Sequence, residues 1–136
     1  MAKVIKIDHV ALIVDDIQSS RQFWQEALGI EMSHIDDIPS EQTKVAFFPL
    51  AGGEIELVQP TTSDSGLARY LAKRGPGMHH ICLEVDDIEV MLAHLKAKGI
   101  QLINENPICG ADGKEYAFIH PKSANGVLVE LYELHN

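Results

Sequence analysis

IDHVALIVDDI at residues 7–17 and MHHICLEVDDI at residues 78–88 are two versions of one pattern. Each version carries a histidine near its start, an alternating apolar run, and a pair of aspartates before a helical pattern. A second echo follows, since residues 44–49 (KVAFFP) and 54–57 (EIEL) correspond to residues 115–120 (EYAFIH) and 128–131 (LVEL). An internal repeat of this kind predicts two copies of one supersecondary unit.

Each copy supplies one histidine and one glutamate, namely His9 with Glu56 and His80 with Glu130. The second histidine follows the first by 71 positions (80 − 9) and the second glutamate follows the first by 74 (130 − 56). A loop between strands absorbs the difference of three residues. Two histidines and two glutamates placed by duplication are ligands typical of a divalent metal site.

The alternation of side chains along a strand divides each stretch into two faces. In the first strand, His9 lies opposite the apolar face that suits covering by a helix. The same alternation places Glu56, His80 and Glu130 opposite the helix-packing faces of their own strands. A lone histidine or glutamate on a strand is usually structural or solvated. Repetition on matching faces favours a shared metal site instead.

Helix signals occur at the same places in both copies. A strand over roughly residues 4–14 precedes a helix capped at Asp15 and ended by Gly29. Asp86 and Gly99 bound the corresponding helix of the second copy, and residues 65–73 read as a short amphipathic helix between the copies. Each copy is therefore expected to run strand, helix, strand, strand, strand.

Length and composition limit the possible classes. The 136 residues predict one domain, residues 1–136, with a first module at about 1–63, a linker helix at about 64–75 and a second module at about 76–136. A net charge of −9 argues against a nucleic-acid partner. No apolar run approaches the roughly 18 residues that span a bilayer. With no evident export signal and two cysteines expected to be reduced, we expect a cytoplasmic location.

Other polar residues receive mostly structural assignments. His79 points opposite to His80 and is expected to pack or cap, and Cys82 is expected to be a small buried thiol. His120 is expected to be structural or to line a pocket. Because the chain is acidic, an anionic substrate would need a local basic patch. The candidates for it are Arg69, Lys73, Arg74, Lys114 and Lys122.

Three stretches resemble the vicinal oxygen chelate superfamily, which includes glyoxalase I, extradiol dioxygenases, fosfomycin-resistance proteins and the methylmalonyl-CoA epimerases. They are GMHHICLEVDDI (77–88), GADGK (110–114) and HPKSANGVLVEL (120–131). The resemblance covers essentially the whole chain. It is closest to the epimerase family, and residues 120–131 are its most specific part.

The resemblance implies an α+β fold of two tandem βαβββ modules, whose curved eight-stranded mixed sheet surrounds a metal held by His9, Glu56, His80 and Glu130. It implies an epimerase that interconverts 2R- and 2S-methylmalonyl-CoA through a metal-stabilised enolate, with Glu130 as the acid/base at C2. Cobalt is the expected ion, and nickel, manganese or zinc also suit the donors. An acyl-CoA substrate and a homodimer are expected.

Two departures and two alternatives accompany this resemblance. Some epimerases carry glutamine in place of Glu56, and a second acid/base carboxylate of some members would fall within residues 44–48, where this chain has none. One alternative is glyoxalase I activity on a glutathione hemithioacetal. The other is a non-catalytic protein that binds a small molecule, which four retained ligand-type residues argue against.

Overall fold

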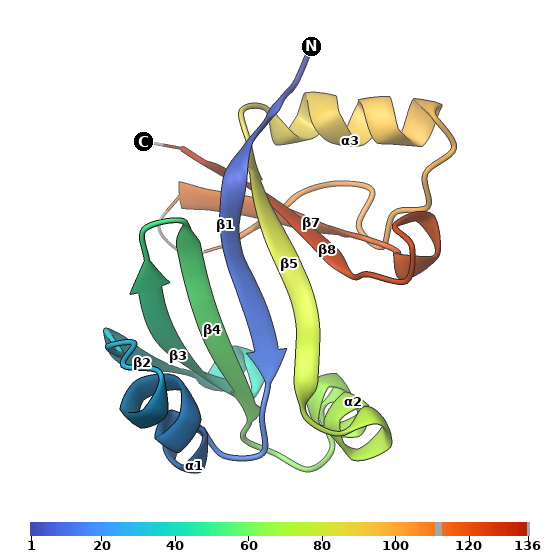
Figure 1. Ribbon diagram of the computed structural model, residues 1–136. Helices are drawn as coiled ribbons and strands as arrows, with labels where there is room; N and C mark the ends of the chain where they lie inside the picture. The colour runs from blue at the N-terminus through green and yellow to red at the C-terminus, as the bar shows by residue number, and fades with distance from the viewer. Residues whose placement is uncertain (111–112, 136) are drawn as a thin grey trace. The chain divides into compact units, whose positions relative to one another are not determined.

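The computed structural model describes residues 1–110 and 113–135, and its elements repeat in order along the chain (Figure 1). The first copy contains β1 (Val4–Ile13), α1 (Ile17–Arg21) continued by η1 (Gln22–Ala27), β2 (His34–Ile38), η2 (Pro39–Glu41), β3 (Thr43–Leu50) and β4 (Gly53–Pro60). After α2 (Gly66–Arg74), the second copy contains β5 (Gly77–Val85), α3 (Ile88–Ala97), β6 (Ile108–Cys109), β7 (Lys114–Ile119), η4 (Pro121–Ser123) and β8 (Val129–Leu134). The expected βαβββ order is confirmed in both copies.

The chain forms two compact units whose boundaries differ from those of the repeats. The central unit is His9–His79, and the terminal unit combines Met1–Asp8 with the chain from His80 onward. Strands β1 and β5 therefore each contribute residues to both units. The module boundaries expected from the sequence stay a prediction.

In the central unit, the strands follow the order β2-β3-β4-β1. β1 runs parallel to β4, while β2 and β4 each pair antiparallel with β3. One cluster of buried side chains, including Ile17, Phe48 and Leu57, has Trp24 of η1 packed against it. A second cluster holds Ala11 and has partly buried side chains of β2, β3 and α2 packed against it.

In the terminal unit, β5 runs parallel to β8, and β7 pairs antiparallel with both β8 and β6. Helix α3 covers one face of these strands through Ile88 and Leu92, which pack with Val85, Ala117, Ile119, Val129 and Leu131. The opposite face is thus left to the residues of alternate parity.

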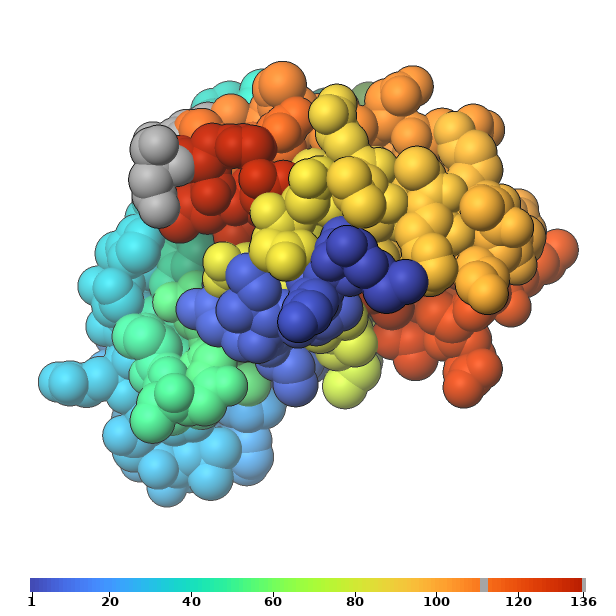
Figure 2. All heavy atoms as spheres, turned by 90° about the horizontal axis from the view of Figure 1, so that it is seen from above, coloured from blue at the N-terminus to red at the C-terminus, as the bar shows by residue number. Residues whose placement is uncertain are grey.

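The N-terminal segment is part of the terminal unit through backbone and side-chain contacts. The Lys3 amide donates to Oδ1 of Asp86 at 2.7 Å, and the Asp86 amide donates to the Lys3 carbonyl at 3.1 Å. Figure 2 shows this dark-blue segment against the yellow chain at the end of β5. Because β1 continues into the central unit, the strand order is β2-β3-β4-β1-β5-β8-β7-β6, which confirms the expected eight-stranded mixed sheet.

Both helix caps lie one residue later than expected. Asp16, not Asp15, caps α1 by accepting from the Ser19 amide at 2.9 Å. Asp87, not Asp86, caps α3 by accepting from the Val90 amide at 3.1 Å. An N-cap side chain bonds the amide three residues on, so the second aspartate of each pair fits the start of the helix. In the second copy, Asp86 instead binds the N-terminal segment.

The ends of these helices follow the prediction. Gly29 and Gly99 both have left-handed backbones, with φ of 80° and 79°. Such a conformation beyond the last turn favours glycine. The first helix differs from expectation in its second half, because η1 is π-helical and the Leu28 amide donates to the Phe23 carbonyl at 2.9 Å. No helix in the described part of the chain is long and apolar enough to cross a bilayer.

Candidate metal centre

The central unit holds the first predicted pair, His9 and Glu56. Nδ1 of His9 lies 3.0 Å from Oε2 of Glu56, and the two side chains are only 4% and 13% exposed. The parallel register of β1 and β4 places Glu56 directly opposite Ala11, two residues beyond His9. Residues two apart on a strand share a face, so His9 and Glu56 meet diagonally on one face of this sheet.

The terminal unit holds the second predicted pair, His80 and Glu130. Nε2 of His80 lies 3.1 Å from Oε1 of Glu130, and both side chains are 11% exposed. The parallel register of β5 and β8 places Glu130 opposite Cys82, again two residues beyond the histidine. Both units thus build their pair with the same element types, the same strand direction and the same diagonal offset.

Each pair is chemically suited to hold a cation. A buried carboxylate or imidazole is costly unless it is partnered, and each side chain here lies within ion-pair distance of the other. Imidazole nitrogen and carboxylate oxygen are the donors that cobalt, nickel, manganese and zinc accept. The donor chemistry of both pairs therefore fits the implied divalent ion.

A polar network lies next to the second pair on the same face of the terminal unit. The Tyr132 hydroxyl donates to Oδ1 of Asp8 at 2.7 Å and lies 3.2 Å from Oε1 of Glu84. Burial raises the pKa of Tyr132, and the hydrogen bond to Asp8 raises it further. Sequence reasoning missed this network. Spacing along the strands could have indicated it. Tyr132 stands two residues beyond Glu130 and Glu84 four beyond His80, so both lie on the same strand faces as the predicted ligands.

The remaining candidates have other partners. His79 packs edge-on against Tyr70 of α2 with ring centroids 4.8 Å apart, as its predicted packing role requires. His120 starts η4, where its Nδ1 accepts from the Lys122 amide at 3.0 Å, which is a structural role. Arg74 lies over the same Tyr70 ring at 5.1 Å.

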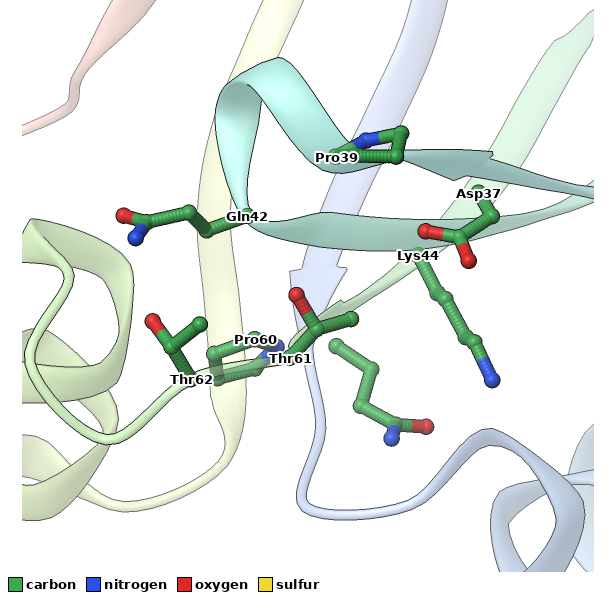
Figure 3. A pocket seen from close by; sticks show the side chains of 8 residues that line it. Asp37, Pro39, Gln42, Lys44, Pro60, Thr61 and Thr62 are labelled. Atoms are coloured by element: carbon green, nitrogen blue, oxygen red, sulfur yellow. The ribbon is translucent and has the colours of Figure 1, made fainter.

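The central unit also contains a groove that sequence reasoning did not anticipate (Figure 3). Its volume is about 530 Å³, and its labelled side chains come from the ends of β2, β3 and β4 and the turns beside them. Asp37 and Lys44 are its charged residues. It includes none of the four predicted ligands, so it is separate from both His–Glu pairs. The lining residues are Asp37, Pro39, Gln42, Lys44, Gln59, Pro60, Thr61 and Thr62.

Comparisons with known proteins agree with the geometry. Residues 8–118 match the model of the glyoxalase/bleomycin resistance protein/dioxygenase superfamily. The mitochondrial methylmalonyl-CoA epimerase of Bos taurus is 40% identical over 93% of this chain and 73% of its own length. A solved methylmalonyl-CoA epimerase in complex with methylmalonyl-CoA and NH4+ superposes with a TM-score of 0.86, at 28% identity over 97% of this chain and 96% of that one.

A glyoxalase relative is more distant. A lactoylglutathione lyase of Arabidopsis thaliana is 27% identical over 92% of this chain, which spans 43% of that protein. The similarity to the epimerases is thus higher in identity and covers more of the relative.

The two cysteines should differ in reactivity. Burial raises the pKa of the Cys82 thiol and the charge of Glu130 raises it further, so Cys82 stays a protonated, enclosed thiol at pH 8. Since the thiolate is the reactive form, we expect only the exposed Cys109 to react with a thiol reagent in the native protein, and both to react in denaturant. Cys109→Ser should abolish native labelling, and Cys82→Ser should retain it. Rapid native labelling of Cys109→Ser would contradict the burial of Cys82.

Proposed function

Because the chain belongs to the methylmalonyl-CoA epimerases of the glyoxalase/bleomycin resistance/dioxygenase superfamily, we propose that it interconverts 2R- and 2S-methylmalonyl-CoA. The observation that carries this proposal is the His–Glu pair repeated on one sheet face of each unit, in a chain 40% identical to a mammalian epimerase. The reaction removes the hydrogen at C2, between the thioester and the carboxylate, and returns it to the opposite face.

We propose that His9, Glu56, His80 and Glu130 are the four protein ligands of one divalent ion. The matching diagonal offsets in the two units and the donor chemistry of both pairs support this assignment. Cobalt is our first choice, with nickel, manganese or zinc as alternatives. Such an ion supplies Lewis-acid stabilisation of the negative charge that develops on the thioester oxygen.

Glu130 is the residue that we assign to proton transfer at C2. Its carboxylate lies 3.1 Å from His80 and stands on the face of the sheet that α3 does not cover. The imidazole orients this carboxylate, which is buried and stands opposite Phe118 in the β7–β8 register. A positioned carboxylate typically contributes about 10²- to 10⁴-fold to such a step.

Epimerisation also needs a proton carrier on the opposite face of C2. Strand β3 offers no carboxylate over residues 44–48, and its Phe47 stands directly opposite Glu56. We therefore assign the second face to a water molecule. Glu130 alone would return the proton to the face of C2 from which it removed it.

We further propose a cytoplasmic homodimer. The first half of β1 exposes apolar side chains, with Ile5 and Ile7 on one face at 55% and 54% exposure. Exposed apolar faces of this kind are usually covered by a partner. A second copy of the chain would cover them in a closed pair.

The metal proposal predicts one bound ion per chain after reconstitution with cobalt, measured by elemental analysis. His80→Ala should lose the ion, and His94→Ala, a histidine of α3 outside both pairs, should retain it. At free metal of about 100 times Kd, binding should stabilise the fold by about 2.7 kcal/mol, seen as a Tm that falls when chelator is added. A Tm indifferent to chelator, or an unchanged ion content in His80→Ala, would refute the ligand set.

The epimerase proposal predicts exchange of the C2 hydrogen of methylmalonyl-CoA in deuterated water, followed by mass spectrometry. Glu130→Gln should slow exchange at least about 100-fold, because an amide cannot accept the proton. Glu133→Gln is the matched control on the same strand, since Glu133 caps α3 at the Ile88 amide and a glutamine oxygen can still accept that bond. Turnover of the methylglyoxal–glutathione adduct without exchange of methylmalonyl-CoA would make the protein a glyoxalase instead.

The dimer proposal predicts twice the chain mass by sedimentation equilibrium at micromolar concentration. Ile7→Lys should shift the equilibrium to monomer by placing a charge on the apolar face of β1. Ile103→Lys alters a side chain that is equally exposed, at 51%, and should leave the dimer intact. A wild-type monomer across this concentration range would overturn the proposal.

A further inference from the structure

One face of the terminal unit continues from the His80–Glu130 pair to a lysine. In the β7–β8 register, Phe118 stands opposite Glu130 and Tyr116 opposite Tyr132. Lys114 has the same parity as Tyr116 and Phe118, so all three side chains project on the face that carries Glu130. The face therefore consists of three successive rows, of which the first holds Glu130, the second Tyr132 and the third Lys114.

Lys114 does not extend away from this face. Its Nζ lies 4.4 Å from the centroid of the Tyr132 ring, so the ammonium of the third row reaches back over the second. An ammonium over a tyrosine face is held by the ring quadrupole without losing its charge. The ring thus fixes a positive charge one row from Glu130.

This ammonium has no carboxylate partner within ion-pair distance among the residues that the structure describes. Lys6 and Lys96, in contrast, pair with Glu84 at 3.7 Å and with Glu105 at 3.1 Å. The side chain following Lys114, Glu115, has the opposite parity and pairs with His135 at 2.5 Å. In a chain with a net charge of −9, a half-buried lysine that pairs with none of the described carboxylates is available to an anionic ligand.

The position of the charge selects which anion it can serve. Rows on one strand face are about 7 Å apart, and the ammonium lies over the Tyr132 ring, in the row next to Glu130. The substrate carboxylate is bonded directly to C2, the atom that Glu130 would deprotonate. The CoA phosphates are separated from C2 by the whole pantetheine arm and lie beyond this reach.

We propose that the Lys114 ammonium binds the free carboxylate of the substrate and so makes the site selective for CoA thioesters that carry a second, free carboxylate. This inference rests on the proposed function, and it assigns Lys114 as a substrate-binding residue of that site. The ammonium donates a charge-assisted hydrogen bond to one carboxylate oxygen, and the Tyr132 ring holds it in place from below. An acyl-CoA without the carboxylate gains nothing from this contact.

The test compares two ligands and three proteins by calorimetry. Metal-loaded wild type should bind methylmalonyl-CoA more tightly than propionyl-CoA, which lacks only the carboxylate. Lys114→Met, which keeps the length of the side chain and removes its charge, should weaken methylmalonyl-CoA binding about 10- to 100-fold and change propionyl-CoA binding less than about twofold. Lys98→Met removes the same charge at the C-terminal end of α3, outside this face, and should bind both ligands as wild type does.

Further readouts separate this inference from its premises. Lys114→Arg keeps the charge and should therefore retain most of the preference for methylmalonyl-CoA that Lys114→Met loses. Lys114→Arg and Lys114→Met should both keep the wild-type circular dichroism spectrum and metal content. Equal weakening of both ligands in Lys114→Met, or a preference unchanged by it, would overturn the carboxylate assignment. Failure of wild type to exchange the C2 hydrogen would instead refute the proposed function, whatever Lys114 binds.

Discussion

Each unit of this protein depends on one buried His–Glu pair. The histidine and the glutamate stand on two parallel strands, and their contact constrains how those strands are arranged. Burying an imidazole or a carboxylate alone would cost several kcal/mol of folding free energy. In the pair, each group gives the other a polar partner and so offsets part of this desolvation cost. The pairing requires that the two strands run in the same direction and that the glutamate face the residue two beyond the histidine. Parallel neighbours need a long crossover, and the helix of each βαβββ copy lies within that crossover.

In the terminal unit, alternate residues of a strand have different roles because they lie on opposite faces of the sheet. On β8, Glu130 and Tyr132 project on the face left open by α3, where they meet His80 and Asp8. Glu133 has the other parity, and its Oε1 accepts from the Ile88 amide at 2.8 Å at the start of α3. A single strand therefore presents polar chemistry on one side and a helix cap on the other. A register shift of one residue would exchange these roles and destroy both.

Much of this architecture could be predicted from the sequence because the same sequence pattern occurs in both copies. The alternation around His9 and His80 gave the strands and their faces, and Gly29 and Gly99 gave the helix ends, where local backbone conformation decides. In the second copy the first aspartate, Asp86, accepts from the Lys3 amide, a tertiary contact that no local pattern encodes, and Asp87 caps the helix. The Asp8–Tyr132 bond joins residues 124 positions apart, so only the assembled strands could reveal it. The same holds for the contact of Lys114 with the Tyr132 ring.

The division of β1 between two units affects how the chain can fold during translation. Residues 1–8 are translated well before their partners in the terminal unit, because Asp86 follows Lys3 by 83 residues and Tyr132 follows Asp8 by 124. The central unit, in contrast, has its full sequence once His79 has been translated. The N-terminal half of β1 therefore cannot form its hydrogen bonds with the terminal unit until Asp86 and Tyr132 have been translated. Closing such long loops is slow, so this first strand is where a nascent-chain chaperone would have most to protect.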